Sequence, residues 1–77
     1  MAFVDLAGHT IENVRIEMQY KGNYHLLATI DGKALKYVIR KGTPEHEEIT
    51  MTGLSNLTEE RIKELVERLL LPKIEKE

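Results

Sequence analysis

The histidines are the side chains best suited to metal chemistry in this sequence, and His46 has the most acidic surroundings. It is followed by Glu47 and Glu48, so an imidazole nitrogen and carboxylate oxygens, all of which are zinc donors, occur together. His9 and His25 lie in other segments. None of the three histidines has a second ligand at the spacing typical of zinc sites. We therefore predict no metal site, no cofactor, and an exposed connecting segment around His46.

Nucleophilic catalysis has few candidates. There is no cysteine, and Ser55 is the only serine, where a local backbone hydrogen bond is its expected role. Asp31 is explained by a turn, and no glycine-rich loop leads from a strand into a helix with a lysine. The sequence predicts no catalytic residue and a protein that is not an enzyme.

Length and composition favour one small domain, residues 1–77, near the lower limit for a core without cross-links. Because the chain has no cysteine, we expect a reducing, intracellular and cytoplasmic setting. No run approaches the roughly 18 apolar residues of a membrane span, so no membrane partner is expected. The N-terminus has neither a basic region nor a long apolar stretch, so no signal peptide is expected.

A hairpin centred on Asp31-Gly32 must position most of the other side chains. With these as a two-residue loop, Ile30 pairs with Lys33, and burial of the apolar face fixes the register. The apolar face then consists of Tyr24, Leu26, Ala28, Ile30, Leu35, Tyr37 and Ile39, and the opposite face of His25, Leu27, Thr29, Ala34, Lys36, Val38 and Arg40.

A longer strand precedes this hairpin, because apolar and polar residues alternate after Thr10, and residues 4–6 form a short first strand. A three-residue loop, Lys21-Gly22-Asn23, keeps the alternating apolar residues beside Tyr24 and Leu26. A two-residue loop would set them beside the mixed face, so we predict the longer one. The residues expected on the buried face are Val14, Ile16, Met18 and Tyr20.

Two further elements follow Arg40. Residues 41–44 interrupt the ladder, and residues 48–52 alternate again, which predicts a strand with Ile49 and Met51 inward. A helix is expected over about 58–70. Thr58 is a suitable N-cap, and Pro72 disfavours helical backbone at the preceding residue, which leaves a short polar tail over 72–77. Ile62, Leu65, Val66 and Leu69 form its apolar stripe, and Glu64 has the spacing to pair with Arg68.

These elements predict the α+β class: an antiparallel β-meander of four to five strands within residues 2–52, with one C-terminal helix packed on the sheet. The sheet is either open or closed into a small barrel. At this level the arrangement resembles the SH3-like barrels of small archaeal chromatin proteins, although those are strongly basic and this chain has a net charge of −2.

Gly8, Ile11, Met18, Asn23 and Leu26, followed by Ile39-Arg40-Lys41-Gly42, are similar in spacing to the two signature segments of Sm-like RNA-binding proteins. The sequence departs from that pattern at Asn13, Gln19 and Gly22, and Lys41 separates an arginine and a glycine that are adjacent in the family. We therefore assign no family from these residues.

Several apolar residues that lie outside the predicted core favour association with another protein. Leu27 and Val38 lie opposite the expected helix, and the residues after the helix stripe add to them, so the expected interaction surface is Leu27, Val38, Leu70, Leu71 and Ile74. The alternative for the last three is that they fold back over the end of the sheet. We expect a small non-enzymatic interaction module of the accessory, inhibitor or phage type, whose partner is a second copy or another protein.

Nucleic-acid binding is the alternative function. Arg15, Lys36, Arg40 and Lys41 give the sheet a weakly basic side. Against this, the predicted register buries the tyrosines, and single-strand binding usually needs exposed aromatic rings.

Overall fold

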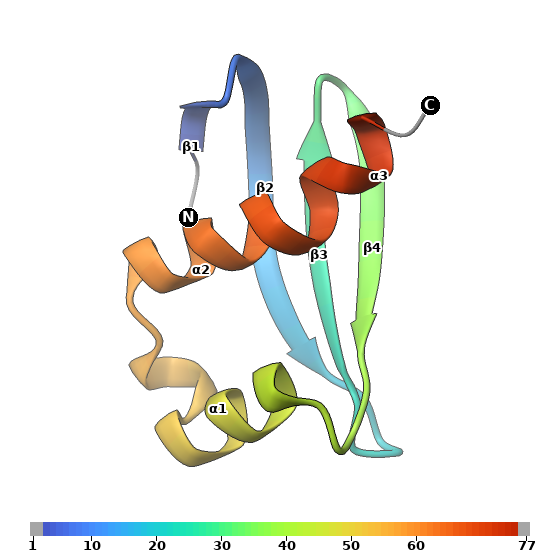
Figure 1. Cartoon of the computed structure of the whole chain (residues 1–77), viewed down its shortest axis with the longest axis vertical. Coiled ribbons are helices and arrows are strands. Elements are labelled where there is room, and N and C mark those ends of the chain that lie inside the picture. Colours follow the sequence, from blue (N-terminus) through green and yellow to red (C-terminus); the bar gives the residue numbers. More distant parts are fainter. Residues whose placement is uncertain (1–2, 76–77) are drawn as a thin grey trace.

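One antiparallel sheet, with its strands in chain order, organises the structure (Figure 1). The structure is a computed structural model that describes residues 3–75, with side chains described from residue 6 onward. Three long strands, β2 (His9–Met18), β3 (Tyr24–Ile30) and β4 (Lys33–Ile39), are joined at the β2 side by the short β1 (Phe3–Leu6). The expected α+β class, antiparallel sheet and C-terminal helix are confirmed. The described strands form an open sheet and not an SH3-like barrel, because β1 and β4 are its two outer members.

The β3–β4 hairpin has the predicted register. Ile30 pairs with Lys33, Leu26 with Tyr37, and the pairing continues without a shift to the far end of the hairpin. Asp31 has a φ of 53° and Gly32 a φ of 82°, as a two-residue turn with both central residues at positive φ requires. The residues of β3 alternate between buried and half-buried, so the apolar face is the inner one.

The β2–β3 connection is longer than the predicted three residues. Met18 pairs with Tyr24, so five residues form the loop, which is closed by a hydrogen bond of 2.8 Å from the Gln19 N–H to the Asn23 carbonyl. Both lengths are odd, so the same face of β2 stays inward. The prediction that Met18 and Tyr20 are buried was wrong, because the ladder ends two residues earlier: Met18 is 63% exposed and Tyr20 is 95% exposed.

A bulge in β2 adjusts its inner face. The pairing shifts between Glu12 and Arg15, and Asn13 has a φ of 54°. The extra residue changes the alternation, so both Ile11 and Val14 face the core and are buried.

A helix, α1 (Pro44–Thr52), stands where a strand over 48–52 was predicted. The Thr43 side chain caps it by accepting a hydrogen bond from the His46 N–H at 3.2 Å, and Pro44 takes the first helical position, where a missing N–H costs nothing. Only one residue of the predicted pair, Ile49, is buried, while Met51 is 87% exposed. The predicted strand and the predicted exposed connection around His46 were therefore both wrong.

The C-terminal helix begins as predicted but continues past its predicted end. A short 3₁₀ turn, η1 (Leu54–Asn56), leads to α2 (Glu59–Leu65), a π-helical turn η2 (Val66–Leu70) and α3 (Leu71–Glu75). Thr58 caps α2 by accepting from the Arg61 N–H at 3.1 Å. The Leu71 N–H donates to the carbonyl of Val66, five residues back, and this wider turn accommodates Pro72 within the helix.

The π turn also changes which residues face the sheet. It adds one residue to the helical repeat, so Leu70 and Leu71 turn inward and are 0% and 2% exposed, whereas Leu69 is half-buried. The C-terminal helix crosses one face of the sheet from the β2 side to β4, and the core lies between them (Figure 1). The core residues are Leu6, Ile11, Val14, Tyr24, Leu26, Ala28, Ile30, Ile39, Ile49, Ile62, Leu65, Val66, Leu70 and Leu71.

Candidate interaction surface

The outer sheet face, which looks away from the C-terminal helix, carries two of the predicted interaction residues. Leu27 and Val38 alternate with buried residues of their strands and are half-buried. Leu27 lies between Arg15 on β2 and Lys36 on β4. We define the outer sheet face by the residues that follow this alternation: Glu12, Arg15, Glu17, His25, Leu27, Thr29, Ala34, Lys36 and Val38.

The other three predicted interaction residues belong to the inside of the domain. Leu70 and Leu71 are buried core residues, and Ile74 is partly buried against the same core. Their prediction as an exposed surface was wrong because the π turn rotates them toward the sheet. They are buried because the helix continues across the sheet, whereas the alternative had them fold back over the end of the sheet.

The four predicted basic residues do not form one patch. Arg15 donates to Glu17 on its own strand, Nε to Oε2, at 3.0 Å, so its charge is compensated. Lys36 lies two strands away on the outer sheet face, with Leu27 between them. Arg40 and Lys41 follow β4, at the end of the sheet where the β2–β3 loop lies (Figure 1).

The outer edge of β4 is partly covered. The Lys73 ammonium donates to the Lys36 carbonyl at 2.7 Å and lies 5.6 Å from the centre of the Tyr37 ring. An edge strand otherwise offers unpaired backbone groups to other chains, and a lysine over them hinders strand addition. Association through the β4 edge is therefore less favoured than association through the outer sheet face.

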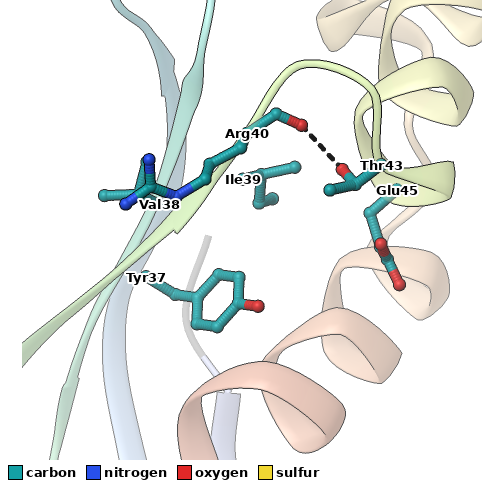
Figure 2. A pocket seen from close by; sticks show the side chains of 6 residues that line it. All are labelled: Tyr37, Val38, Ile39, Arg40, Thr43 and Glu45. Atoms are coloured by element: carbon teal, nitrogen blue, oxygen red, sulfur yellow. Dashed lines mark hydrogen bonds between the residues drawn. The ribbon is translucent and has the colours of Figure 1, made fainter.

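Two pockets lie beside α1. One, of about 90 Å³, has Tyr37 and Glu45 on opposite walls, and the Thr43 hydroxyl donates to the Arg40 carbonyl beside it at 2.8 Å (Figure 2). Typical small-molecule sites enclose about 300–1,000 Å³. The other is a shallow groove of about 310 Å³, lined by His46, Glu47, Thr50 and Met51.

Two of the three histidines, His9 and His46, have hydrogen-bond partners in the structure. His46 Nε2 donates to the Gly22 carbonyl at 2.6 Å, since a carbonyl only accepts, and His9 Nδ1 contacts Asp31 Oδ2 at 2.5 Å. Across residues 3–75, no three histidine or carboxylate side chains gather as a metal site would require.

Arg61 forms an ion-pair network that joins α1 to α2. Its guanidinium donates two hydrogen bonds to the Glu48 carboxylate, at 2.6 and 2.7 Å, and one to Glu64 at 3.0 Å. These bonds hold the pKa of Glu48 below its ordinary value of 4.5 and raise the pKa of Arg61. Arg68 contacts Glu45 at 3.7 Å, so the expected pairing of Arg68 with Glu64 is replaced.

A second carboxylate with a lowered pKa, that of Asp31, lies at the opposite end of the sheet. Asp31 accepts hydrogen bonds from the His9 side chain and from the Thr10 N–H, and these bonds hold its pKa below the ordinary value of 3.8. Both carboxylates therefore favour the folded state more when they are ionised than when they are protonated.

We expect the domain to lose stability in acid through these two groups. A folded-state pKa below the unfolded one contributes stability that is present above the unfolded value and lost as the pH falls through the folded value. Unfolding by urea, followed by circular dichroism between pH 7 and pH 2, should show a decline that starts near pH 4.5. Glu48→Gln should make this decline shallower, and Glu67→Gln, at an exposed position, should leave it unchanged. An equally steep decline in Glu48→Gln would contradict the assignment.

Comparisons with protein families, with curated proteins and with solved structures give no match to this chain. No helix within residues 3–75 has the length and apolar character needed to cross a membrane.

Sequence reasoning missed the exposed ring of Tyr20 and the contact between α1 and the β2–β3 loop. The helix that makes this contact was signalled, because a threonine followed by proline and glutamate, Thr43-Pro44-Glu45, is a typical helix start. The first had no local signal, since it depends on where the ladder ends.

Proposed function

We propose that this chain is a small non-enzymatic interaction module of the accessory or inhibitor type, which binds a second copy of itself through the outer sheet face. The observation that carries the proposal is an uncovered face with Leu27 on β3 and Val38 on the neighbouring strand β4, while the C-terminal helix crosses the other face (Figure 1). The absence of cysteine supports a reducing, intracellular setting for this activity.

Two-fold symmetry makes a second copy a suitable partner, because Leu27 on the middle strand of the three would meet Leu27 of the second copy. Glu17, His25 and Val38 lie in one row across the three strands. A two-fold axis parallel to the strands would place β4 of one copy over β2 of the other. Glu17 of one copy would then face the second copy's Val38, with Lys36 two residues away on the same strand. In the next row Arg15 would face Lys36 of the second copy, a like-charge contact that the ion pair of Arg15 with Glu17 partly compensates, so burial of Leu27 and Val38 carries the association.

The size of the face sets the expected affinity. Three strands spaced about 4.8 Å apart and about 23 Å long give a footprint of roughly 330 Å² per copy, which is below the range of stable, specific interfaces. Interfaces below about 1,200 Å² in total are usually weak, so we expect a dissociation constant in the micromolar range.

Sedimentation velocity from a few micromolar to about 0.5 mM tests the proposal. The protein should shift from monomer to dimer, and Leu27→Arg should raise the dissociation constant at least tenfold by placing a charge at the centre of the face. Met51→Arg, on the exposed side of α1, is the matched control and should dimerise normally. A wild-type protein that stays monomeric at 0.5 mM, or a folded Leu27→Arg variant that still dimerises, would refute the proposal.

A further inference from the structure

Four exposed side chains lie on two separate connections at the same end of the sheet (Figure 1). The β2–β3 loop contributes Tyr20 and Lys21, and the turn from β4 to α1 contributes Arg40 and Lys41. We call these four residues the loop-end cluster. It is distinct from the outer sheet face, so its function does not depend on the proposed dimer.

Specific contacts hold the two connections together. The Asn23 side chain accepts a hydrogen bond from the Lys41 N–H at 3.1 Å, and His46 donates to the Gly22 carbonyl. The Lys41 side chain lies across Gly22, where a Cβ atom would come within 2.1 Å of Lys41 Cε. The aromatic ring and the cations are therefore attached to one connected unit.

The cations of the cluster are available to a ligand. Among the described residues, Lys21, Arg40 and Lys41 form no ion pair, whereas Arg15 is paired with Glu17. Two nearby carboxylates on α1 are largely compensated, because Glu45 contacts Arg68 and Glu48 binds Arg61. A third α1 carboxylate, Glu47, lines the groove beside His46.

Tyr20 supplies an exposed aromatic ring, and the expected lack of such a ring was the argument against nucleic-acid binding. Its ring is 95% exposed, next to Lys21 in the loop. Proteins that bind single-stranded nucleic acid combine cations along the backbone path with aromatic rings on which bases stack. We propose that the loop-end cluster binds single-stranded nucleic acid, with a base stacked on Tyr20 and phosphates at Lys21, Arg40 and Lys41.

The acidic surroundings favour a narrow strand over a broad anionic surface. A lipid bilayer that reached Lys21 and Lys41 would also approach the acidic first turns of α1, which include Glu45 and Glu47. A single strand follows the cations without covering that helix. Three phosphate contacts predict weak binding, with log K falling against log salt concentration with a slope of about −2.

The sequence contains no tryptophan, so Tyr20→Trp would place a unique fluorophore at the proposed stacking position. Titration with a ten-nucleotide oligothymidylate should quench the indole emission, and the affinity should show the same salt slope. In anisotropy measurements with the labelled oligonucleotide, Tyr20→Ala should weaken binding by about 5- to 150-fold, the range for one lost stacking contact.

Charge reversal supplies the matched comparison. Lys21→Glu with Lys41→Glu should reduce affinity at least tenfold, whereas Lys63→Glu, an exposed lysine of α2, should change it less than threefold. Circular dichroism checks that each variant folds. Equal binding of single-stranded DNA, duplex DNA and polyphosphate would overturn the proposal, as would indole quenching by anionic phospholipid vesicles but not by the oligonucleotide.

Discussion

Tyr24→Ala should lower the free energy of unfolding by about 3–5 kcal/mol, the cost of removing a large buried aromatic ring. Tyr24 is 5% exposed, its hydroxyl lies 2.9 Å from the Thr50 hydroxyl, and its ring centre lies 4.8 Å from that of His46. Both partners belong to α1, so the loss should also free this helix from the sheet. Urea denaturation measures the first effect, and amide hydrogen exchange over residues 44–52 measures the second.

Tyr20→Ala is the matched control, because it removes the same atoms from a ring that is 95% exposed. We expect its stability to stay within about 0.5 kcal/mol of the wild type. Similar losses in the two variants would mean that the β2–β3 ladder does not end at Met18.

Leu71→Ala should cost about 2–5 kcal/mol, as a core truncation. This expectation reverses what the sequence indicates, which places the end of the helix near residue 70 and Leu71 at the surface. In the structure the Leu71 side chain is 2% exposed and packs in the core under its own helix. Its truncation therefore leaves a cavity between the helix and the sheet. Such a loss is a large share of the stability that a domain of 77 residues holds.

Thermal and urea unfolding of Leu71→Ala should be compared with Met51→Ala, which truncates a helical side chain that is 87% exposed. The control should change stability by no more than about 0.5 kcal/mol. A Leu71 variant as stable as the control would place the side chain outside the core and would contradict the π turn.

Local rules predicted the elements whose geometry is fixed within a few residues. The two-residue turn at Asp31-Gly32 has few conformations, so the register of the hairpin follows from it, and so does the placement of Leu27 and Val38 on the outer sheet face. Thr58 likewise marks the start of α2.

The sequence-based predictions failed where two sequence signals of similar strength favour different structures. Ile49 and Met51 fit a strand by alternation, but the cap and the proline before them begin a helix. The β2–β3 loop lengths of three and five residues keep the same face inward, so patterning alone does not separate them.

The candidate sites were predicted in part for the same reasons. Arg40 and Lys41 were identified as basic candidates, but their neighbour Tyr20 was assigned to the buried face. Leu70 and Leu71 were assigned to the surface because a regular 3.6-residue repeat excludes them from the apolar stripe, and only the wider turn restores them.

That wider turn gives the C-terminal helix one place where its length could change. Deleting Glu67 would turn the five-residue step between Val66 and Leu71 into the four-residue step of a regular α-helix, and the apolar stripe would continue in phase. Pro72 would then meet the carbonyl four residues before it, so the shortened helix would also need Pro72→Ala. A deletion earlier, within α2, would instead rotate the cap and every preceding residue by about 100° relative to the residues after the deletion.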